Sequence, residues 1–307
     1  MMTDTDTDFD RLAAPYRREL LAHCYRMLGS AADAEDAVQE TYLRAWRAYG
    51  GFDGRSSLRT WLYRIATNVS ITAAEQRGRR PLPSGLAGPS EPDAPLVEGV
   101  RWLGPLPDDP AAVAAGRAGL RLALVAALQH LPGRQRAVLI LRDVLGWPAA
   151  EVADLLGTST VSVKSALQRA RERLGTLRLA EDDVAEPGPS DLLDRYVSAF
   201  ATADVTALTA LLRADATLEM PPYANWFAGR DDVLAFLAAR MLDGRIDAVP
   251  TAANGQPAVA IWRDGQPHAI QVLDVRDGLV AGIVVFLDPD LFGSFAPFAK
   301  SVRHEPG

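Results

Sequence analysis

The sequence contains a single cysteine, Cys24, and no long run of apolar residues. One thiol excludes an internal disulfide and leaves no cysteine-based metal site. A membrane-spanning helix needs about 18 or more consecutive apolar residues, and no stretch of this chain approaches that length. The N-terminus, MMTDTDTDFD, is acidic and polar, unlike a signal or transit peptide. We therefore expect a cytoplasmic protein with no membrane partner.

The chain also lacks the excess of positive charge expected of a protein that simply coats DNA, because its net charge is −7. Its 307 residues, 48% hydrophobic and 23% charged, are ordinary for a soluble protein of two or three domains. The charge is uneven, however. Residues 134–178 contain eight basic and four acidic residues, whereas residues 190–307 contain nine basic and fifteen acidic ones. This asymmetry predicts that nucleic acid binds the former segment and something else the latter.

The stretch Trp147–Leu174 has the pattern of two helices joined by a very short turn. Gly157 would end the first helix, and the hydroxyls of residues 158–160 would cap the second. An apolar stripe at helical spacing runs along the second helix: Val163, Leu167, Ala170 and Leu174. Short polar groups near its start and arginines further on are typical of a helix in the major groove. An ordinary helical hairpin with a solvated basic face has the same pattern.

Residues 8–80 predict a compact helical domain with three long helices. The first spans about Phe9–Leu28, the second begins at Ser30, and the third is capped by Ser56 or Ser57. The third helix interleaves aromatic and basic side chains: Arg59, Trp61, Tyr63, Arg64 and Asn68. Such a surface suits unstacked bases and their phosphates. Alternatively, Trp61 is simply part of the core.

Two of these stretches resemble a known family. DAEDAVQETYLRAWR followed by LRTWLYRIATN resembles the second domain of extracytoplasmic-function (ECF) sigma factors of bacterial RNA polymerase. The helix-turn-helix with SVKSALQRARERL is similar to the fourth domain of that family. The two motifs occur in the right order and together cover about half of the chain.

The resemblance implies roles for matching positions. Residues that would clamp the coiled coil of the largest subunit of core RNA polymerase are Asp33, Asp36, Gln39 and Glu40. Residues that would melt and read the −10 promoter element are Arg59, Trp61, Tyr63, Arg64 and Asn68. Residues that would contact the −35 element are Ser162, Lys164, Ser165, Arg169 and Arg173. Ala166 stands where the family often has arginine, which leaves the −35 sequence open.

The segment 81–112 predicts a linker, because it is dense in proline, glycine and acidic residues. It nevertheless contains VRWLGPLP, and Trp102 and Leu103 should be buried against something. They could equally pack on the neighbouring helical domains. The second helical domain follows at 113–180, with predicted helices from about Ala111 to Gln129 and from Arg134 to Leu145.

Residues 190–300 begin with helical patterns and continue with several β-rich runs. This order predicts an α+β cone with a curled antiparallel sheet. MPPYANWFAGRDDV resembles the SnoaL-like branch of the NTF2 fold, whose members include cyclases and ketosteroid-isomerase-like enzymes. Candidates by residue type for a carboxylate base and its partners are Glu219, Asp215, Tyr196, Tyr223 and His268. Their spacing does not demand catalysis, so we predict no catalytic residue, no metal site and no cofactor, and leave open whether the cone binds a small apolar ligand.

A subgroup of ECF sigma factors carries such a SnoaL-like tail, with a Trp-Leu-Pro motif in the linker and an Asn/Asp-Pro-Asp-Leu motif near the C-terminus. Here Trp102-Leu103-Gly104-Pro105 and Asp288-Pro289-Asp290-Leu291 are similar. The resemblance implies cis-regulatory contacts made by Trp102, Leu103, Asp288, Pro289 and Asp290.

The sequence thus predicts a multidomain protein, with two all-α sigma domains followed by an α+β cone. It would bind core RNA polymerase and promoter DNA, direct initiation, and be monomeric when free, with the cone acting in cis. One alternative is an isomerase, cyclase or ligand sensor fused to a DNA-binding module. Another is a one-component repressor, which would leave the surface from Trp61 to Asn68 unexplained.

Overall fold

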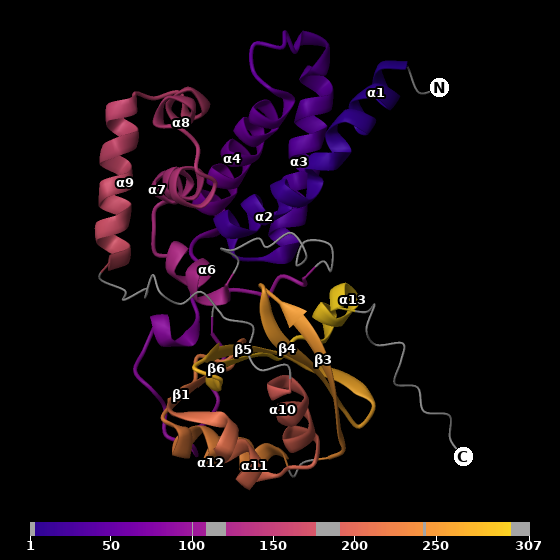
Figure 1. Cartoon of the computed structure of the whole chain (residues 1–307), viewed down its shortest axis with the longest axis vertical. Helices are drawn as coiled ribbons and strands as arrows, with labels where there is room; N and C mark the ends of the chain where they lie inside the picture. Colours follow the sequence, from indigo (N-terminus) through magenta and orange to yellow (C-terminus); the bar gives the residue numbers. More distant parts are fainter. Residues whose placement is uncertain (1–3, 100, 109–120, 176–190, 242–243, 296–307) are drawn as a thin grey trace. The chain divides into compact units, whose positions relative to one another are not determined.

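The computed structural model of the chain divides into two compact units, each built from two separate stretches of sequence (Figure 1). The first unit combines residues 1–80 and 119–180, and the second combines residues 81–118 and 181–307. The linker predicted between the helical domains therefore groups with the C-terminal part of the chain. The structure describes residues 4–99, 101–108, 121–175, 191–241 and 244–295.

The first predicted helix of the first unit is interrupted near its start. Helix α1 covers Asp4–Ala13 and α2 covers Arg17–Leu28, with the 3₁₀ turn η1 at Ala14–Tyr16 between them. Pro15 explains the break, because it has no amide hydrogen and its ring crowds the preceding turn. Helix α2 ends at Gly29 in the left-handed conformation, as predicted.

The next two helices begin at the predicted serines. Helix α3 covers Ala31–Ala48, and Ser30 accepts a hydrogen bond from the backbone amide three residues on. After the 3₁₀ turn η2 at Tyr49–Gly51, helix α4 covers Leu58–Arg77. Of the two candidate caps, Ser57 accepts the amide hydrogen bond at 3.0 Å. Local capping chemistry thus sets both helix starts.

His23 lies at the centre of this three-helix core. The side chain has no exposed surface, and its Nε2 lies 2.9 Å from the Thr67 hydroxyl oxygen on α4. Burial, and then the charge of Arg26, lowers the pKa of His23 to about 3. The imidazole is therefore neutral when the domain is folded.

We expect His23 to make the first unit sensitive to acid. The unfolded chain protonates this imidazole near pH 6.5 while the folded chain does not, so the free energy of unfolding falls as pH drops below 6.5. Between pH 7 and pH 5 the loss from this group is about 2 kcal/mol. In urea denaturation, His23→Gln should retain a partner for Thr67 and lose correspondingly less stability over that interval. Equal losses in both proteins would contradict this role.

The second helical part of the first unit consists of short helices. Helix α6 covers Leu122–Leu128, α7 covers Gly133–Leu139, and a π-helical turn, η4, follows at Ile140–Val144. The helix-turn-helix consists of α8, Ala149–Leu156, and α9, Thr160–Gly175. Helix α4 packs against both α7 and α8, so this part shares a core with the first three helices.

The turn between α8 and α9 confirms the sequence prediction in detail. Gly157 has a φ of 61°, and the Ser159 hydroxyl accepts the amide hydrogen bond of Ser162 at 3.1 Å. All members of the predicted apolar stripe are buried: Val163, Leu167, Ala170 and Leu174. Of the helix predicted from about residue 111 to 129, residues 111–120 lie outside the described residues, and the remaining part contains helix α6.

The helices of the second unit lie against one face of a curved sheet (Figure 1). They are α10, Leu192–Ala201, α11, Val205–Leu211, and α12, Arg230–Met241. A short turn, η5 at Pro289–Leu291, and α13, Phe292–Phe295, follow the last strand. None of the described helices in either unit combines the length and apolarity needed to cross a membrane.

The sheet has six strands in the order β2-β1-β6-β5-β4-β3. Their bounds are β1 Leu212–Glu219, β2 Trp226–Ala228, β3 Ile246–Ala253, β4 Gln256–Arg263, β5 Gln266–Arg276 and β6 Leu279–Phe286. The predicted turns at Asp264-Gly265 and Asp277-Gly278 have the positive φ angles of tight hairpins. The expectation of a purely antiparallel sheet was wrong, because β1 and β6 pair in parallel. They are separated by a long crossover rather than by a hairpin.

The linker of the second unit forms the 3₁₀ turn η3 at Pro83–Gly85, and the rest of its described residues have little regular structure. It forms two isolated β-bridges with the cone, Glu98 with Tyr223 and Pro107 with Ala253. It therefore runs across the cone surface as an extended strap.

Candidate nucleic-acid interface and linker contacts

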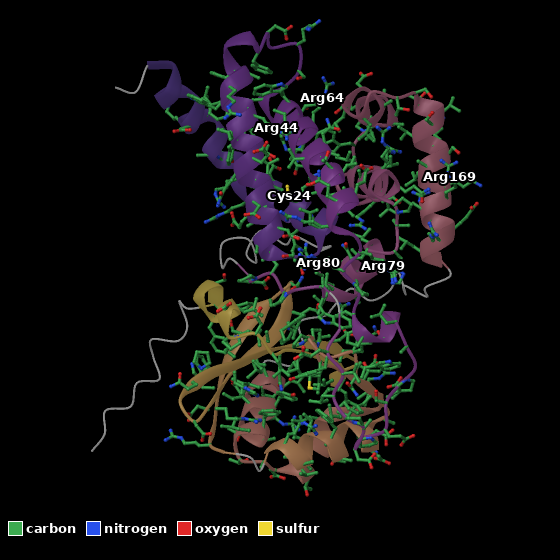
Figure 2. The ribbon with its side chains drawn as sticks, turned by 180° about the vertical axis from the view of Figure 1, so that it is seen from behind. Cys24, Arg44, Arg64, Arg79, Arg80 and Arg169 are labelled. Atoms are coloured by element: carbon green, nitrogen blue, oxygen red, sulfur yellow. The ribbon has the colours of Figure 1, made fainter. Side chains whose placement is uncertain are left out.

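Helix α9 has the geometry expected of a helix that reads DNA. Its buried stripe leaves the opposite face free, and there Ser162, Lys164, Arg169 and Arg173 are exposed while Ser165 is half-buried. The Arg169 guanidinium donates to the Ser165 hydroxyl. Figure 2 shows Arg169 pointing away from the other helices. All five predicted −35 contact residues thus lie on one helix, with Ser162, Lys164 and Ser165 in its first half and the two arginines in its second half.

The predicted −10 surface is arranged differently from the expectation of an open platform. Tyr63 has no exposed surface, and its ring centroid lies 5.1 Å from that of Trp147, just before α8. The Arg59 guanidinium lies over both rings, 5.0 Å from the first centroid and 5.6 Å from the second. The helix-turn-helix part therefore covers this end of α4.

Polar contacts hold the same buried corner. Arg59 forms a bidentate interaction with Glu19 of α2 at 2.8–3.0 Å, and the Tyr63 hydroxyl donates to the same carboxylate at 3.3 Å. Burial, and then the Glu19 charge, raises the pKa of Tyr63, so its hydroxyl remains a neutral donor. Arg64 donates to the Asp154 carbonyl oxygen of α8 at 3.0 Å, and Figure 2 shows it beside that helix. Arg59, Tyr63 and Arg64 are all engaged within the protein.

The two remaining members of the predicted −10 set are more accessible. Asn68 is exposed on α4. Trp61 is half-buried, and its ring lies 4.9 Å from that of Phe52 in the preceding loop. Only part of the predicted surface is therefore open to DNA in this conformation.

A second contact between the two helical parts is made by Arg136 of α7, which is 4% exposed. Its guanidinium donates to the Met27 carbonyl oxygen of α2 and to the Gln129 side-chain oxygen. It also donates to the Gln129 and Leu131 carbonyl oxygens at 3.2 and 3.0 Å. Burial lowers the pKa of Arg136 to about 10, so it is still charged at neutral pH. One buried cation thus satisfies carbonyls from both parts.

The predicted polymerase-binding residues lie on α3 with unequal exposure. Asp33 is largely enclosed by ion pairs to Arg77 and Arg80 at 2.5 Å. Asp36 and Gln39 are exposed, and Glu40 pairs with Arg44 at 2.6 Å on the surface. Three of the four side chains are accessible, and the fourth anchors the end of α4.

Trp102 and Leu103 are buried, as predicted, with 8% and 1% exposure. The Trp102 indole nitrogen donates to the Pro222 carbonyl oxygen of the cone at 2.8 Å. Its ring also packs on Gly99, where an added Cβ would lie 2.0 Å from an indole carbon. The linker tryptophan is therefore a contact to the cone.

Further hydrogen bonds run along the linker. Those that join it to the cone are Ser84 N to Glu219 Oε2 at 2.9 Å, Val97 N to Asn225 Oδ1 at 2.8 Å, Leu106 N to Asn254 Oδ1 at 2.9 Å and Gly255 N to Asp108 Oδ1 at 2.9 Å. In the first three, linker amides are satisfied by buried side chains of the cone; in the fourth, a backbone amide of the cone donates to the linker carboxylate of Asp108.

The C-terminal motif follows directly after strand β6. Asp288 and Asp290 are exposed, and the Asp288 carboxylate accepts the Asp290 amide hydrogen bond at 3.0 Å, which caps η5. Pro289 is also exposed, and η5 packs against β5. The residue before this motif, Leu287, donates its amide hydrogen to the Pro221 carbonyl oxygen at 2.9 Å. The Pro222 carbonyl oxygen, one residue further along, accepts the hydrogen bond from the Trp102 indole. The linker motif and the C-terminal motif therefore both adjoin the Pro221-Pro222 segment of the cone.

The candidate catalytic side chains of the cone do not form a site. Asp215 is exposed and pairs with Arg213 at 2.8 Å, while Glu219 accepts the linker hydrogen bond from Ser84. The buried Tyr196 hydroxyl donates to Gln271. Tyr223 and His268 line the internal cavity of the cone, whose described lining includes no carboxylate. The described residues also contain no cluster of three side chains able to hold a metal ion.

Cys24 is buried at the centre of the first unit (Figure 2). Burial raises the pKa of its thiol to about 12. A protonated, inaccessible thiol is unreactive, so this residue acts as a core side chain.

Comparisons with known proteins match all three parts of the chain. The models of Sigma-70 region 2, Sigma-70 region 4 and a SnoaL-like domain match residues 12–80, 121–174 and 193–283. The combination defines a modular transcription factor with two helical DNA-binding parts and a cone. The ECF RNA polymerase sigma factor SigG of Mycobacterium tuberculosis H37Rv is 51% identical over 94% of this chain and 83% of its own length.

The related sigma factor SigJ of the same organism is 30% identical over 90% of both chains. The crystal structure of Mycobacterium tuberculosis SigJ superimposes with a TM-score of 0.65 over 94% of this chain and 98% of that chain, at 23% identity. This chain belongs to the ECF RNA polymerase sigma factors, and it carries a C-terminal SnoaL-like domain. Sigma factors direct transcription initiation at promoters and are not enzymes.

Several functional groups escaped the sequence analysis. Trp147 and Arg136 join the two helical parts, and Glu19 anchors the Arg59 and Tyr63 side chains that Trp147 covers, but in the sequence each is an ordinary core or surface residue. Asn225 lies in the MPPYANWF stretch, which marked the region without indicating that its amide would bind the linker. Only their positions after folding reveal these roles.

Proposed function

We propose that this sigma factor is regulated in cis by its own linker and cone, which favour a closed arrangement of the two helical parts. The observation that carries the proposal is the burial of Tyr63 against Trp147, with the half-buried Arg59 lying over both rings. A side chain packed in this way cannot stack on an unpaired base at the same time. Binding of the −10 element through these residues therefore requires the helix-turn-helix part to leave α4.

Linker docking opposes this opening through chain length. Undocked, the segment between Arg80 and Leu122 could extend by about 3.3–3.6 Å per residue. The hydrogen bonds from Ser84 to Asp108 hold this stretch of the segment on the cone, so that it cannot extend. The docked linker thus restricts how far the two DNA-binding parts can separate, and the cone inhibits in this state.

In the open state we infer the following division of labour. The exposed side chains of α3, Asp36, Gln39 and Glu40, bind core RNA polymerase, with Asp33 holding the end of α4. Arg59, Trp61, Tyr63, Arg64 and Asn68 melt and read the −10 element. Ser162, Lys164, Ser165, Arg169 and Arg173 bind the −35 element. The described lining of the cone cavity offers no carboxylate to act as a base, so we assign the cone no enzymatic role.

Run-off transcription tests the DNA-binding assignment. With purified core RNA polymerase and promoters selected from genomic DNA, Arg169→Ala should lower the yield of specific transcript about 10-fold. Loss of one base-edge or phosphate contact on α9 costs about 1–3 kcal/mol. The matched control is Arg195→Ala, an exposed arginine on α10, which should transcribe like the unmodified chain. Equal yields from both variants would contradict the assignment of α9.

A further inference from the structure

A cavity of about 270 Å³ lies inside the cone, between the curved sheet and its helices. Most of its wall is apolar, with Phe200 from α10, Leu218 from β1, Phe236 from α12 and Ile261 from β4. Its volume is close to the lower end of the range for small-molecule sites, about 300–1,000 Å³, and well above the roughly 150 Å³ that accommodates benzene. The space fits one small molecule with an apolar body.

Basic groups gather at one part of this wall: Arg240, Arg263 and His268. Arg263 donates to the Arg240 carbonyl oxygen at 3.3 Å, and the Arg240 guanidinium lies 3.9 Å above the Phe236 ring. The Arg263 Nε atom is buried and has no hydrogen-bond partner within the described residues. Neither guanidinium forms an ion pair with a carboxylate of the described chain. Two cations thus line an otherwise apolar cavity, and none of the described residues supplies a counter-charge.

Such an arrangement favours an anion. A partly buried guanidinium without a counter-charge has lost hydration that it does not regain from the protein, and a bound carboxylate restores both charge and hydrogen bonds. The planar donors of arginine match the two oxygens of a carboxylate. Burial, and then the charge of Arg263, lowers the pKa of His268, so its neutral ring can donate a single N–H at pH 7.

We propose that the cone binds a small amphipathic monoanion, such as a medium-chain carboxylate. Its anionic group would lie beside Arg240 and Arg263, within reach of His268. Its apolar body would occupy the space against Phe236 and Leu218. This ligand differs from the small apolar ligand considered from the sequence, because the two arginines require a negative charge.

The cavity also has a wall from the linker, because Leu96 lines it. The next residue, Val97, donates its amide hydrogen to Asn225, and Ala224 donates to the Val97 carbonyl oxygen at 2.7 Å. A ligand that touches Leu96 favours the docked linker, and by reciprocity the docked linker favours the ligand. This coupling rests on the proposed regulation in cis, whereas the ligand site itself does not.

Calorimetric titration of the full chain at pH 7 with octanoate, 1-octanol and octylamine tests the site. We expect octanoate to bind at least 10-fold more tightly than the neutral alcohol, and the cationic amine not to bind. Arg263→Met and Arg240→Met should each abolish the preference for octanoate while filling similar space. The matched control is Arg245→Met, which removes an exposed arginine paired with Asp247 and should bind octanoate normally.

The proposed site would be overturned if octanoate bound no more tightly than octanol. It would also be overturned if Arg245→Met weakened octanoate binding as much as the two cavity variants do. If either cavity variant fails to fold, the comparison of the three ligands on the unmodified chain still decides. Hydrogen exchange at the Val97 amide tests the coupling, because saturating octanoate should slow it at least threefold. Unchanged exchange with octanoate bound would overturn the coupling and leave the site standing.

Discussion

Replacing Trp102 with alanine should release the linker from the cone. The substitution removes a nearly buried indole and its hydrogen bond to Pro222, and large-to-small changes of a buried tryptophan cost about 3–5 kcal/mol. Because the indole packs between the linker and the cone, most of this loss lowers the free energy with which the linker docks on the cone. Hydrogen exchange of the linker amides of Gly99, Leu103 and Leu106 should accelerate roughly 100-fold or more.

Two further variants make this prediction specific. Gly99→Ala leaves the tryptophan in place but introduces a methyl group 2.0 Å from an indole carbon, so the ring must move and the linker should again loosen. Val97→Ala is the matched control, because that side chain is 57% exposed and its backbone contacts are unaffected. Linker exchange in Trp102→Ala that resembles exchange in Val97→Ala would show that the indole does not hold the strap.

Replacing Arg136 with methionine should separate the two helical parts of the first unit and weaken its fold. Methionine fills part of the space, but the carbonyl oxygens of Met27, Gln129 and Leu131 lose their shared donor. Each buried group left without a partner costs about 1–3 kcal/mol, so the loss should reach at least about 3 kcal/mol. Urea denaturation of the full chain should show it as a lower midpoint.

The same variant should also uncover the predicted −10 surface on α4. Arg136 of α7 donates to α2, so its loss weakens the contact that keeps the helix-turn-helix part over α4. Binding of a fluorescent single-stranded −10 oligonucleotide should tighten about 10-fold. Arg134→Met, an exposed arginine on the same helix, is the control and should change neither measurement. If Arg136→Met fails to fold, Arg136→Lys keeps one cationic donor and should lie between it and the unmodified chain. An unchanged midpoint in Arg136→Met would contradict the role of this buried cation.

Local signals in the sequence were sufficient for most helices and turns. Ser30, Ser57 and Gly157 mark their boundaries through hydrogen bonds or a left-handed conformation that involve only nearby residues. The apolar stripe of α9 follows from helical spacing alone. The same stretches resemble sigma factors, and from this resemblance the sequence predicted the family. The comparisons confirm that family.

What the sequence could not predict depends on residues distant along the chain. Tyr63 has the pattern of an exposed aromatic, and only the packing of Trp147 shows that it is covered. The parallel pairing of β1 with β6 requires a crossover that no turn motif indicates. Likewise, Arg240 and Arg263 are separated by a helix end and two strands, and their placement in one cavity follows from the curvature of the sheet.

The most direct test of regulation in cis is run-off transcription by the full chain, with limiting core RNA polymerase, for the unmodified protein, Trp102→Ala, Gly99→Ala and Val97→Ala. If the docked linker keeps the two DNA-binding parts together, the first two variants should produce transcript at least 10-fold faster than the unmodified chain. Val97→Ala should match the unmodified chain. Equal rates from all four proteins, with linker exchange shown to be accelerated in Trp102→Ala, would contradict the proposal that linker docking controls this sigma factor.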